Sequence, residues 1–565
     1  MPLKYIFISG GVISGLGKGI SSASIALLLQ QSGFRVTMIK CENYLNLDAG
    51  TINPIEHGDP FLCEDGTEAD MDIGTYEKFL GKNMSRHNFV TMGQIYQTVI
   101  ERERKFEYMG EDVEAIPHIT NEIYRRIKSA ADKDKADIVI IELGGTVGEY
   151  QNLFYYEAAR ILTLKHRDDI LHVHVGYMPT PKHLGEPKTK PIQQSVRALN
   201  SLGIQPDFII ARSEKPLDKR RRDRFSIFCN MLPEDIISSP DAGTVYEVPV
   251  QFYKQGFHHR ICEKLNIKYR QPDLKEWEKL IAKIKSPKKH NITIAIVGKY
   301  FATGEYQLRD SYAALMDAID HASWATDSNI QTLWIDAERV EKDGVAKFIN
   351  PKNVDGIIVP IGWGERGTEG MIKAAGFARD TKIPYLGLCY GMQLAVISFA
   401  RDVVGWKDAN TQENDRKTPH QVIHLMPAQE EFMKRRAYGG TMRLGAWQAI
   451  VKKDTIAYNA YQKYNGFIDE KKGLTAERHR HRYEFNDKFL KDFQQKGMII
   501  SARSVIENLA EIAELPKQVH PFYLGTQGHP EYKSTPLCPH PIFLEFIDTV
   551  INNKHKKDSI KSQES

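Results

Sequence analysis

Cysteines are few in this sequence, and their spacing excludes two classes of protein. The 565 residues include only six, with no CxxC pair among them. Neither a zinc-binding module nor a disulfide-stapled scaffold is therefore indicated, and a reducing, cytoplasmic compartment is expected. The six are Cys41, Cys63, Cys229, Cys262, Cys389 and Cys538.

Long apolar runs and an excess of one charge are also missing. No apolar stretch approaches the roughly 20 residues that span a bilayer, and the N-terminus lacks the charged-then-apolar pattern of a signal peptide. The formal net charge is only +4, with 26% charged and 41% hydrophobic residues. These values predict a soluble globular protein of two or more domains, with neither a membrane nor nucleic acid as a partner.

A glycine-rich loop follows the first predicted strand. Residues 5–8 (YIFI) form an apolar run suited to a buried strand, and residues 20–29 suit a helix. Between them lie five glycines and Lys18, so backbone N–H groups, helix dipole and ammonium would together bind phosphate. The Walker pattern is incomplete, because the earlier glycine falls one place early, at Gly11, and Gly19 replaces Ser/Thr. A glycine-rich turn without a ligand is the alternative.

Carboxylates occur at two places that suit a magnesium ion. Residues 68–72 (EADMD) carry alternating acidic side chains, and the predicted strand 137–142 ends in Glu142. Magnesium prefers one or two carboxylates together with phosphate oxygens and water. For residues 68–72 alone, a solvated acidic loop is an equally good interpretation.

Further strands and helices alternate along the first half. Strands are predicted at 35–40, 171–176 and 207–210, with helices at 121–128 and 194–202, which indicates a doubly wound parallel sheet. Loop 185–193 (GEPKTKPIQ) carries lysines on both sides of Thr189. These suit a triphosphate, and Gln193 could read a base edge, although a solvated loop is the alternative.

The second half contains a candidate nucleophile. After a charged segment at 266–291, strands are predicted at 292–297 and 356–360, followed by the strand–turn–helix of residues 384–393 (PYLGLCYGMQ). Cys389 lies at its turn, where a helix N-terminus stabilises a thiolate. His529 and Glu531 would complete a Cys-His-Glu triad, with oxyanion donors at Gly362 and after Cys389. A buried structural cysteine is the alternative.

Six motifs of the first half carry a family resemblance. They are GGVISGLGKGI, DGTEADMDIGTYEKF, MSRHNF, IPHITNEI, IELGGTVGE and GEPKTKPIQQSV. In this order and at these distances they resemble the amidoligase domain of the CTP synthase family, and the similarity extends from about residue 5 to about residue 546. It implies two doubly wound parallel-sheet domains: a P-loop-like synthetase (amidoligase) domain at 1–265 and a class I glutamine amidotransferase domain at 292–553. The linker would be 266–291, and a disordered tail would occupy 554–565.

The resemblance also implies an activity. UTP would be activated by 4-O-phosphorylation with ATP and Mg²⁺, then aminated to CTP by ammonia released from L-glutamine. GTP would activate the glutaminase, CTP would inhibit at the UTP site, and the chain would form a homotetramer and possible filaments.

Site residues follow from the same resemblance. The Mg²⁺ ligands would be Asp72 and Glu142, and Lys40 would contact the transferring phosphate. ATP would be bound by Gly15, Leu16, Gly17, Lys18, Gly19, Ile20, Lys40, Asp72, Pro240, Asp241 and Ala242. UTP or CTP would be bound by Ser14, Glu149, Tyr150, Gln151, Lys188, Thr189, Lys190, Pro191, Ile192, Gln193 and Arg224. Glutamine would be bound by Gly362, Tyr390, Gly391, Met392, Gln393, Glu413 and Arg480.

Four positions depart from the family pattern. Gln151 replaces an acid and Arg224 a lysine, which bears on the strength of CTP inhibition. Ile361 replaces a glycine, so strain is expected in the oxyanion loop if that position needs a positive φ. Gly528 replaces a phenylalanine, which would remove packing behind His529 and slow glutamine hydrolysis. Two alternatives stay open: an ammonia-dependent enzyme with an impaired glutaminase, and a nonenzymatic filament protein, which would not need these catalytic residues.

Overall fold

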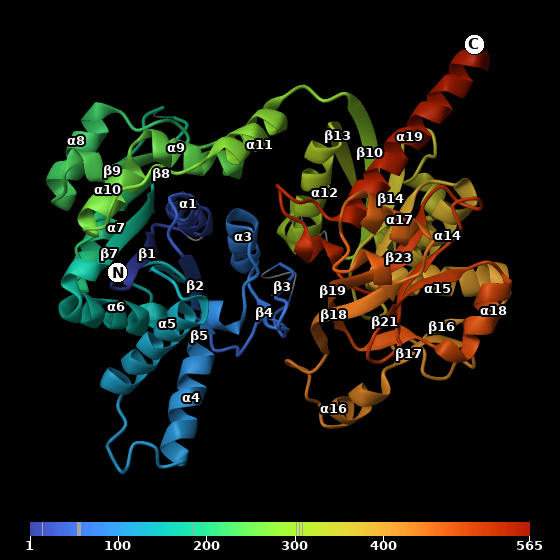
Figure 1. Cartoon of the computed structure of the whole chain (residues 1–565), viewed down its shortest axis with the longest axis horizontal. Helices are drawn as coiled ribbons and strands as arrows, with labels where there is room; N and C mark the ends of the chain where they lie inside the picture. Colours follow the sequence, from blue (N-terminus) through green and yellow to red (C-terminus); the bar gives the residue numbers. More distant parts are fainter. Residues whose placement is uncertain are drawn as a thin grey trace. The chain divides into compact units, whose positions relative to one another are not determined.

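The chain divides into two compact units (Figure 1). The computed structural model describes residues 1–564 apart from 14, 54–57, 184, 301, 304, 305 and 308. The first unit comprises Met1–Ala49 and Asp72–Ala282, and the second comprises Gly50–Met71 and Lys283–Ser565. Residues 50–71, the inserted segment, therefore belong to the second unit although both of their sequence neighbours belong to the first.

The first unit is built on a seven-stranded sheet in which every neighbouring pair is parallel. This confirms the predicted doubly wound parallel sheet. Buried β-branched and aromatic runs form the strands, as expected for a sheet covered on both faces. The spatial order is β5 (Phe89–Thr91), β2 (Val36–Glu42), β6 (Ile138–Leu143), β1 (Lys4–Gly11), β7 (Ile170–Tyr177), β8 (Phe208–Ser213) and β9 (Ile236–Pro240).

Helices cover both faces of this sheet (Figure 1). α1 (Lys18–Gln31) packs on β1, β2 and β6 and against α9 (Val248–Lys254). On the opposite face, α5 (Thr120–Asp134) and α6 (Leu153–Lys165) join a core with Tyr5 and Phe7 of β1. The remaining helices are α3 (Met71–Leu80), α4 (Met92–Arg104), α7 (Lys190–Ser201), α8 (Lys219–Cys229) and α10 (Phe257–Lys264).

The predicted linker 266–291 contains an ordered helix, α11 (Lys275–Lys285). Trp277 on α11 is buried and donates its indole N–H to the carbonyl of Tyr246 at 2.7 Å, with its ring 5.3 Å from that of Phe79. This aromatic packing fixes most of α11 to the first unit, so the division between the units, at Ala282 and Lys283, lies inside the predicted linker.

The second unit is built on a nine-stranded mixed sheet. Its parallel part, with the predicted doubly wound arrangement, is β13 (Ser328–Asp336), β10 (His290–Gly298), β14 (Gly356–Val359), β15 (Tyr385–Leu388) and β23 (Tyr523–Thr526). It continues through antiparallel strands β22 (Ala510–Glu514), β21 (Ile499–Ser504), β18 (Arg443–Val451) and β19 (Leu474–His481). The family resemblance did not anticipate this antiparallel half.

Alternating residues of β10 belong to two different hydrophobic cores. Ala295 and Val297 face a core with α13 (Ala337–Asp343), α14 (Thr368–Thr381) and α15 (Tyr390–Phe399). Ile294 and Ile296 face another core, which includes α12 (Ala313–Ala325), α17 (Ile456–Lys463) and α19 (Pro541–Glu564). The period of two is what a strand buried on both faces requires. Smaller elements are β3 (Phe61–Leu62), β4 (Glu68–Ala69), β11 (Ala302–Thr303), β12 (Tyr306–Gln307), β16 (Asn410–Thr411), β17 (Gln421–Leu425), β20 (Tyr483–Phe485), α16 (Glu430–Lys434) and α18 (Leu490–Gln495).

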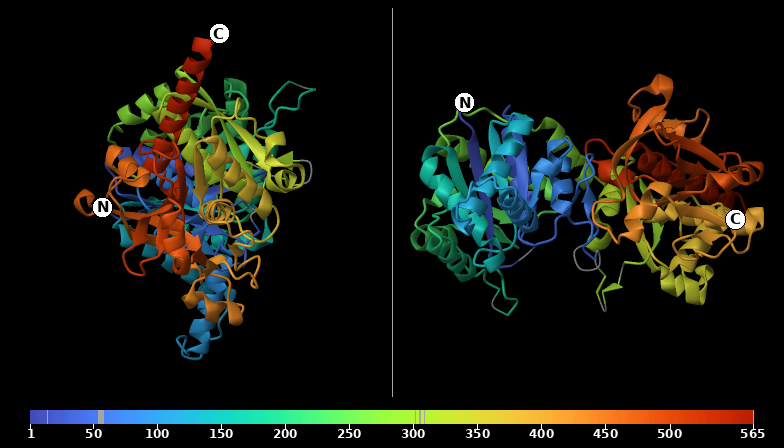
Figure 2. Two further views of the ribbon diagram at one scale, coloured as in Figure 1. Left: turned by 90° about the vertical axis from the view of Figure 1, so that its right-hand side faces the viewer. Right: turned by 90° about the horizontal axis from the view of Figure 1, so that it is seen from below.

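The expected disordered tail is instead helical. α19 runs to Glu564, and its polar C-terminal part extends beyond the rest of the second unit (Figures 1 and 2). Phe546, Ile547 and Val550 anchor its first half in the core, and no proline or glycine interrupts the residues that follow. A helix already nucleated by packing continues through residues that would not form one alone. Among the described residues, no helix has the length and apolar character needed to cross a membrane.

Candidate active site

Lys18 lies where the phosphate loop becomes a helix. α1 begins at Lys18, so its ammonium group and the free N–H groups of the first turn belong to the same helix end. The ammonium donates to the carbonyl of Gly145, in the turn after β6. Burial lowers the pKa of Lys18, and Lys40 lowers it further. A bound phosphate would compensate this buried charge. Of the predicted nucleotide residues, Ser14 lies outside the described residues.

Three carboxylates surround Lys40 at the carboxyl ends of β2 and β6. Its ammonium contacts Asp72, lies 2.8 Å from Glu142 and lies 3.1 Å from Glu42. Burial opposes the charged form, but the carboxylates outweigh burial and raise the pKa of Lys40. Asp72 also adjoins the phosphate loop, because a Cβ added to Gly19 would lie 2.3 Å from its Oδ1. The structure thus brings the predicted phosphate and metal residues together.

Asp72 and Glu142 fit a magnesium ion that is shared with a nucleotide. Both carboxylates reach the ammonium group of Lys40, so they converge on one point. In the described part of the chain, no group of three or more His, Cys, Asp or Glu side chains could hold a metal. Two carboxylates are nevertheless what magnesium uses when phosphate oxygens and water complete its shell.

The predicted UTP loop leads into α7. Gln193 is buried and its amide donates to Oγ1 of Thr189 at 3.1 Å, which fixes the side chain at the start of the helix. Lys188 is partly exposed and pairs with Glu186 at 3.3 Å. Arg221 of α8 donates to the carbonyl of Pro187 at 3.0 Å and so holds this loop against α8.

The other predicted UTP residues differ in how firmly they are held. The carboxylate of Glu149 accepts from the N–H of Thr146 at 2.7 Å and closes the glycine turn. Tyr150 is 95% exposed, and Gln151 and Arg224 are exposed as well. The two departures from the family pattern at the predicted UTP site, Gln151 and Arg224, therefore lie on the surface of this unit.

Arg212, at the end of β8, is a site residue that the sequence did not reveal. It donates to the carbonyl of Pro240 at 3.3 Å and pairs with Asp241 at 3.2 Å. Its Nε lies 3.7 Å from where a Cβ on Gly17 would be. Arg212 thus joins the phosphate loop to the predicted ATP residues 240–242. The available signal was an arginine ending a buried parallel strand.

Cys389 lies on a sharp turn between β15 and α15. Its φ of 50° and ψ of −97° are uncommon for a residue with a side chain. Two glycines permit the turn: a Cβ on Gly387 would lie 2.6 Å from the carbonyl carbon of Gly391, and one on Gly391 would lie 2.0 Å from the carbonyl oxygen of Val359. The predicted strand–turn–helix is present, with the cysteine at the N-terminus of α15.

His529 and Glu531 form a buried pair after β23. Nδ1 of His529 lies 2.8 Å from Oε1 of Glu531. Burial disfavours the imidazolium, but Glu531 and Cys389 outweigh burial and raise the pKa of His529 to about 10. Nε2 has no hydrogen-bond partner among the described residues. Because Glu531 binds the other nitrogen, Nε2 is the one free to take a proton from the thiol.

The expected strain at Ile361 is absent. Ile361 does not have a positive φ, and its side chain is buried in a core with Leu388. The positive φ in this turn falls on Gly364, at 74°. The isoleucine is therefore a core residue, and the turn with Gly362 forms without it needing a left-handed conformation.

The expected space at Gly528 is also absent. A Cβ at this position would lie 2.8 Å from Cβ of Glu477 and 3.3 Å from Nε2 of His479, so these side chains occupy the place of a larger residue. The ring of His529 instead stacks on Tyr532, with centroids 5.1 Å apart. The imidazole of His529 therefore keeps a packing partner.

Five of the seven residues predicted to bind glutamine line one pocket of about 550 Å³, which Cys389 also lines. Gly391 and Met392 lie buried in the first turn of α15. The carboxylate of Glu413 accepts from the N–H of Gly364 at 2.9 Å, and burial raises its pKa. The predicted residues that line the pocket are Gly362, Cys389, Tyr390, Gln393, Glu413 and Arg480.

Arg480, the predicted ligand of the glutamine carboxylate, lines the pocket and also pairs with an internal carboxylate. Its guanidinium donates to Glu68 at 2.6 Å and to the carbonyl of Gly50 at 3.1 Å. Arg482 lines the same pocket and bonds only neutral acceptors, among them Oε1 of Gln429 at 2.6 Å. Arg416 lines the pocket as well, so a substrate carboxylate placed here would meet several guanidinium groups. The sequence RHRHR does not distinguish Arg480 from Arg482, because alternate residues of a strand share a face.

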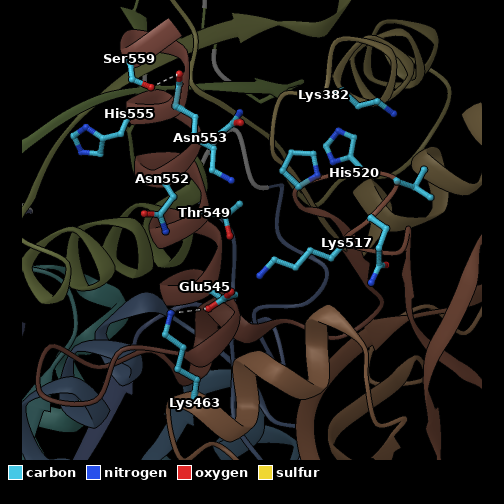
Figure 3. A pocket seen from close by; sticks show the side chains of 14 residues that line it. Lys382, Lys463, Lys517, His520, Glu545, Thr549, Asn552, Asn553, His555 and Ser559 are labelled. Atoms are coloured by element: carbon cyan, nitrogen blue, oxygen red, sulfur yellow. Dashed lines mark hydrogen bonds and ion pairs between the residues drawn. The ribbon is translucent and has the colours of Figure 1, made fainter.

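A second hollow in this unit lies apart from the predicted chemistry. This groove of about 1030 Å³ runs beside α19 and is lined by basic and amide side chains (Figure 3). Lys463 pairs there with Glu545 at 3.0 Å. None of the predicted site residues lines it, so size alone does not identify the active site.

Both halves of the chain match known protein families. Residues 4–267 match the family described as CTP synthase N-terminus, and residues 307–549 match glutamine amidotransferase class-I. The CTP synthase of Caldanaerobacter subterraneus subsp. tengcongensis is 44% identical over 552 residues, which cover 98% of this chain and 99% of that protein. The CTP synthase of Pyrococcus abyssi is 44% identical over 558 residues, with the same coverage. The glutaminase domain of Trypanosoma brucei CTPS with bound acivicin is 34% identical, with a TM-score of 0.40, over 46% of this chain and 94% of that one.

A phosphate-binding unit and a unit with a Cys-His-Glu arrangement define a glutamine-dependent, ATP-driven carbon–nitrogen ligase. With both family matches and full-length relatives at 44% identity, the chain belongs to the CTP synthase family. Its activity is the ATP-dependent amination of UTP to CTP with nitrogen from glutamine.

Proposed function

We propose that the first unit is the amidoligase and the second, with the inserted segment, is the glutaminase. The observation that carries this proposal is that each unit holds one complete set of reactive groups. Lys18, Lys40 and two carboxylates meet in the first unit, and the triad residues meet beside a pocket in the second.

In the amidoligase, the protein positions charges around the γ-phosphate of ATP. Lys18 and the N–H groups of α1 bind phosphate oxygens, and Lys40 reaches the group being transferred. Asp72 and Glu142 hold Mg²⁺, which when bound withdraws charge from the ATP phosphates. The phosphoryl group passes to O4 of UTP and converts a poor leaving group into phosphate. Gln193, Thr189 and the lysines beside it bind UTP, and CTP competes there.

In the glutaminase, the thiolate of Cys389 attacks the side-chain amide carbon of glutamine. His529 takes the thiol proton and returns it to the departing ammonia, and Glu531 holds the imidazole. N–H groups of Gly362 and Tyr390 stabilise the oxyanion. Water then hydrolyses the glutamyl thioester. Glu413 binds the amino group of glutamine, and Arg480 binds its carboxylate with Arg482 beside it in the pocket. Ammonia must reach C4 of UTP unprotonated, because ammonium has no lone pair.

Regulation and assembly extend this proposal. GTP activates the glutaminase, and the chain forms a homotetramer in the cytoplasm that can extend into filaments. Exposed apolar residues beside the predicted UTP site, Tyr150, Ile227 and Phe228, are 95%, 77% and 50% exposed and suit a subunit interface. None of the six cysteines, all of which are described, forms a disulfide, in keeping with a reducing compartment.

The test is CTP formation from UTP and Mg·ATP with either glutamine or ammonium chloride, in the wild type and in Cys389→Ala. Both nitrogen sources should support the wild type, and the variant should keep only the ammonia reaction. If Cys389→Ala still uses glutamine, Cys389 is not the nucleophile. If the wild type is active only with ammonia, its glutaminase is impaired. Unstrained Ile361 and the filled space at Gly528 favour an active one.

A further inference from the structure

A fully buried glutamine contacts the sulfur of Cys389. Nε2 of Gln527 lies 3.4 Å from Sγ, and the side chain is 0% exposed. Its backbone N–H donates to the carbonyl of Glu511 at 2.8 Å, which fixes the residue directly after β23. The sequence motifs give Gln527 no role, because it lies two residues before His529 without belonging to the triad.

A chain of hydrogen bonds fixes the direction of this amide. The backbone carbonyl of Tyr483 can only accept, so it is Nε2 of Gln393 that faces it, at 2.9 Å. The same Nε2 lies 3.1 Å from Oε1 of Gln527 and donates its second hydrogen there. Oε1 of Gln527 is therefore occupied, and its N–H group is the one aimed at the sulfur.

We propose that Gln527 is a catalytic residue that stabilises the thiolate of Cys389 through this N–H···S hydrogen bond, and that Gln393 is the positioning residue that aims it. The proposal rests on the proposed role of Cys389 as the glutaminase nucleophile. A thiol sulfur is a weak acceptor and a thiolate is a strong one, so a buried N–H donor favours the ionised sulfur.

The hydrogen bond acts at two points of the reaction. When Sγ attacks the amide carbon of glutamine, the S–C bond forms, the carbonyl oxygen takes the charge, and the bond to Gln527 weakens. The C–N bond then breaks, and ammonia leaves with the proton held by His529. When water hydrolyses the thioester, the thiolate leaves and the bond from Gln527 forms again. Gln527 thus stabilises both the nucleophile and the later leaving group.

Other charged or titratable groups around the sulfur act at the same time. The pKa of His529 already reflects Cys389, and the carbonyl of Arg480 lies 3.8 Å from Sγ. The groups near the sulfur, its turn and its pocket are His529, Glu531, Tyr390, Arg480 with Glu68, Glu413, Lys299, Arg416, Arg482, His481, Tyr438 and Tyr483. The experiment must therefore separate Gln527 from this background.

The experiment is the pH dependence of alkylation of Cys389 by iodoacetamide in the full-length chain, followed by mass spectrometry of its peptide. All proteins carry Cys538→Ser, because Cys538 is the exposed cysteine. Gln527→Met should move the midpoint of the profile upward by about one pH unit, which is tenfold less thiolate below the midpoint. Gln30→Met, which removes an amide bonded to the carbonyl of Leu80 in the first unit, should leave it unchanged.

A second pair of variants tests whether Gln393 orients the amide of Gln527. Gln393→Met frees the amide of Gln527 to rotate, so the midpoint should rise here too. The double variant should rise no further than Gln527→Met, because both changes remove one hydrogen bond. Additive shifts would overturn the positioning role of Gln393. If Gln527→Met does not fold by circular dichroism, Gln527→Glu keeps the shape, removes the donor and should raise the midpoint further.

The outcomes separate this inference from the proposed function. An unchanged midpoint in a folded Gln527 variant overturns the inference, even when Cys389 is essential for glutamine use. If Cys389→Ala still makes CTP from glutamine, the proposed function itself fails, whatever the alkylation profile shows.

Discussion

The guanidinium of Arg480 donates to the carboxylate of Glu68 at 2.6 Å, across 412 positions of sequence, and both side chains are buried. Glu68 belongs to the inserted segment and Arg480 to β19. The same segment supports the catalytic imidazole, because Asp59 accepts from Tyr532 at 2.8 Å and Tyr532 stacks on His529. Residues that interrupt the sequence of the first unit therefore pack around the proposed glutaminase site in the second.

Breaking this ion pair should destabilise the second unit. In Glu68→Gln the buried charge of Arg480 loses its nearest carboxylate and keeps only Asp59, at 3.9 Å, so the cost should be up to about 3–5 kcal/mol. Urea unfolding with circular dichroism would measure the loss, and glutamine-dependent CTP formation should fall with it. Glu430→Gln, at an exposed pair with Lys434, should change stability by less than about 0.5 kcal/mol. Equal free energies of unfolding for the two variants would contradict a stabilising role of the ion pair between Glu68 and Arg480.

Glu531 should set the alkaline limit of glutamine hydrolysis. The imidazolium of His529 must persist to protonate the leaving ammonia, and Glu531 helps to hold its pKa at about 10 against burial. Glu531→Gln lowers this pKa, so activity should be lost at lower pH on the alkaline side, with kcat reduced roughly 10²- to 10⁴-fold. The pH profile of glutamate release measures both effects. An unmoved alkaline limb would contradict the role of Glu531, and ammonia-dependent CTP formation is the control.

Lys299 should be needed to hold the oxyanion turn. Its ammonium donates to the carbonyls of Trp363 and Gly364 at 2.9 and 2.7 Å and lies 4.7 Å from the centre of the Tyr390 ring. Lys299→Met releases the turn that carries the N–H of Gly362. We expect glutamine-dependent kcat to fall by roughly 10- to 100-fold, with the ammonia reaction preserved. Equal losses with both nitrogen sources would indicate general misfolding instead. Lys347→Met, at an exposed pair with Asp343, serves as the matched control.

Local features were predictable from the sequence, and features made by distant contacts were not. Lys18 and Cys389 lie in short motifs whose glycines and strand–helix junctions carry the signal within about ten residues. The parallel sheet of the first unit was predictable because apolar strand patterns alternate with helix patterns along the sequence. The pairing of Arg480 with Glu68 spans 412 positions, so no local spacing encodes it.

The misjudged segments share a physical reason. Trp277 gains its burial from aromatic partners elsewhere in the chain, so the composition of the linker could not show that its helix packs on the first unit. The polar end of α19 is helical because the preceding turns are packed. At Ile361 and Gly528, family patterns suggested defects that neighbouring side chains remove.

Two buried histidines should make the first unit sensitive to mild acid. Burial lowers the pKa of His172 to about 4, and burial with the charge of Lys18 lowers that of His174 to about 3. In the unfolded chain both titrate near pH 6.5, so below that pH the unfolded state binds protons that the native state does not. Stability is therefore complete above about pH 6.5 and falls as the pH drops toward 4, by about 2 kcal/mol per histidine at pH 5. Native-state hydrogen exchange of peptides from β7 would measure this slope. His172→Gln, which can keep the bond to Thr163, should flatten it, whereas His183→Gln at an exposed position should not. A slope unaffected by His172→Gln would show that other groups control the acid response.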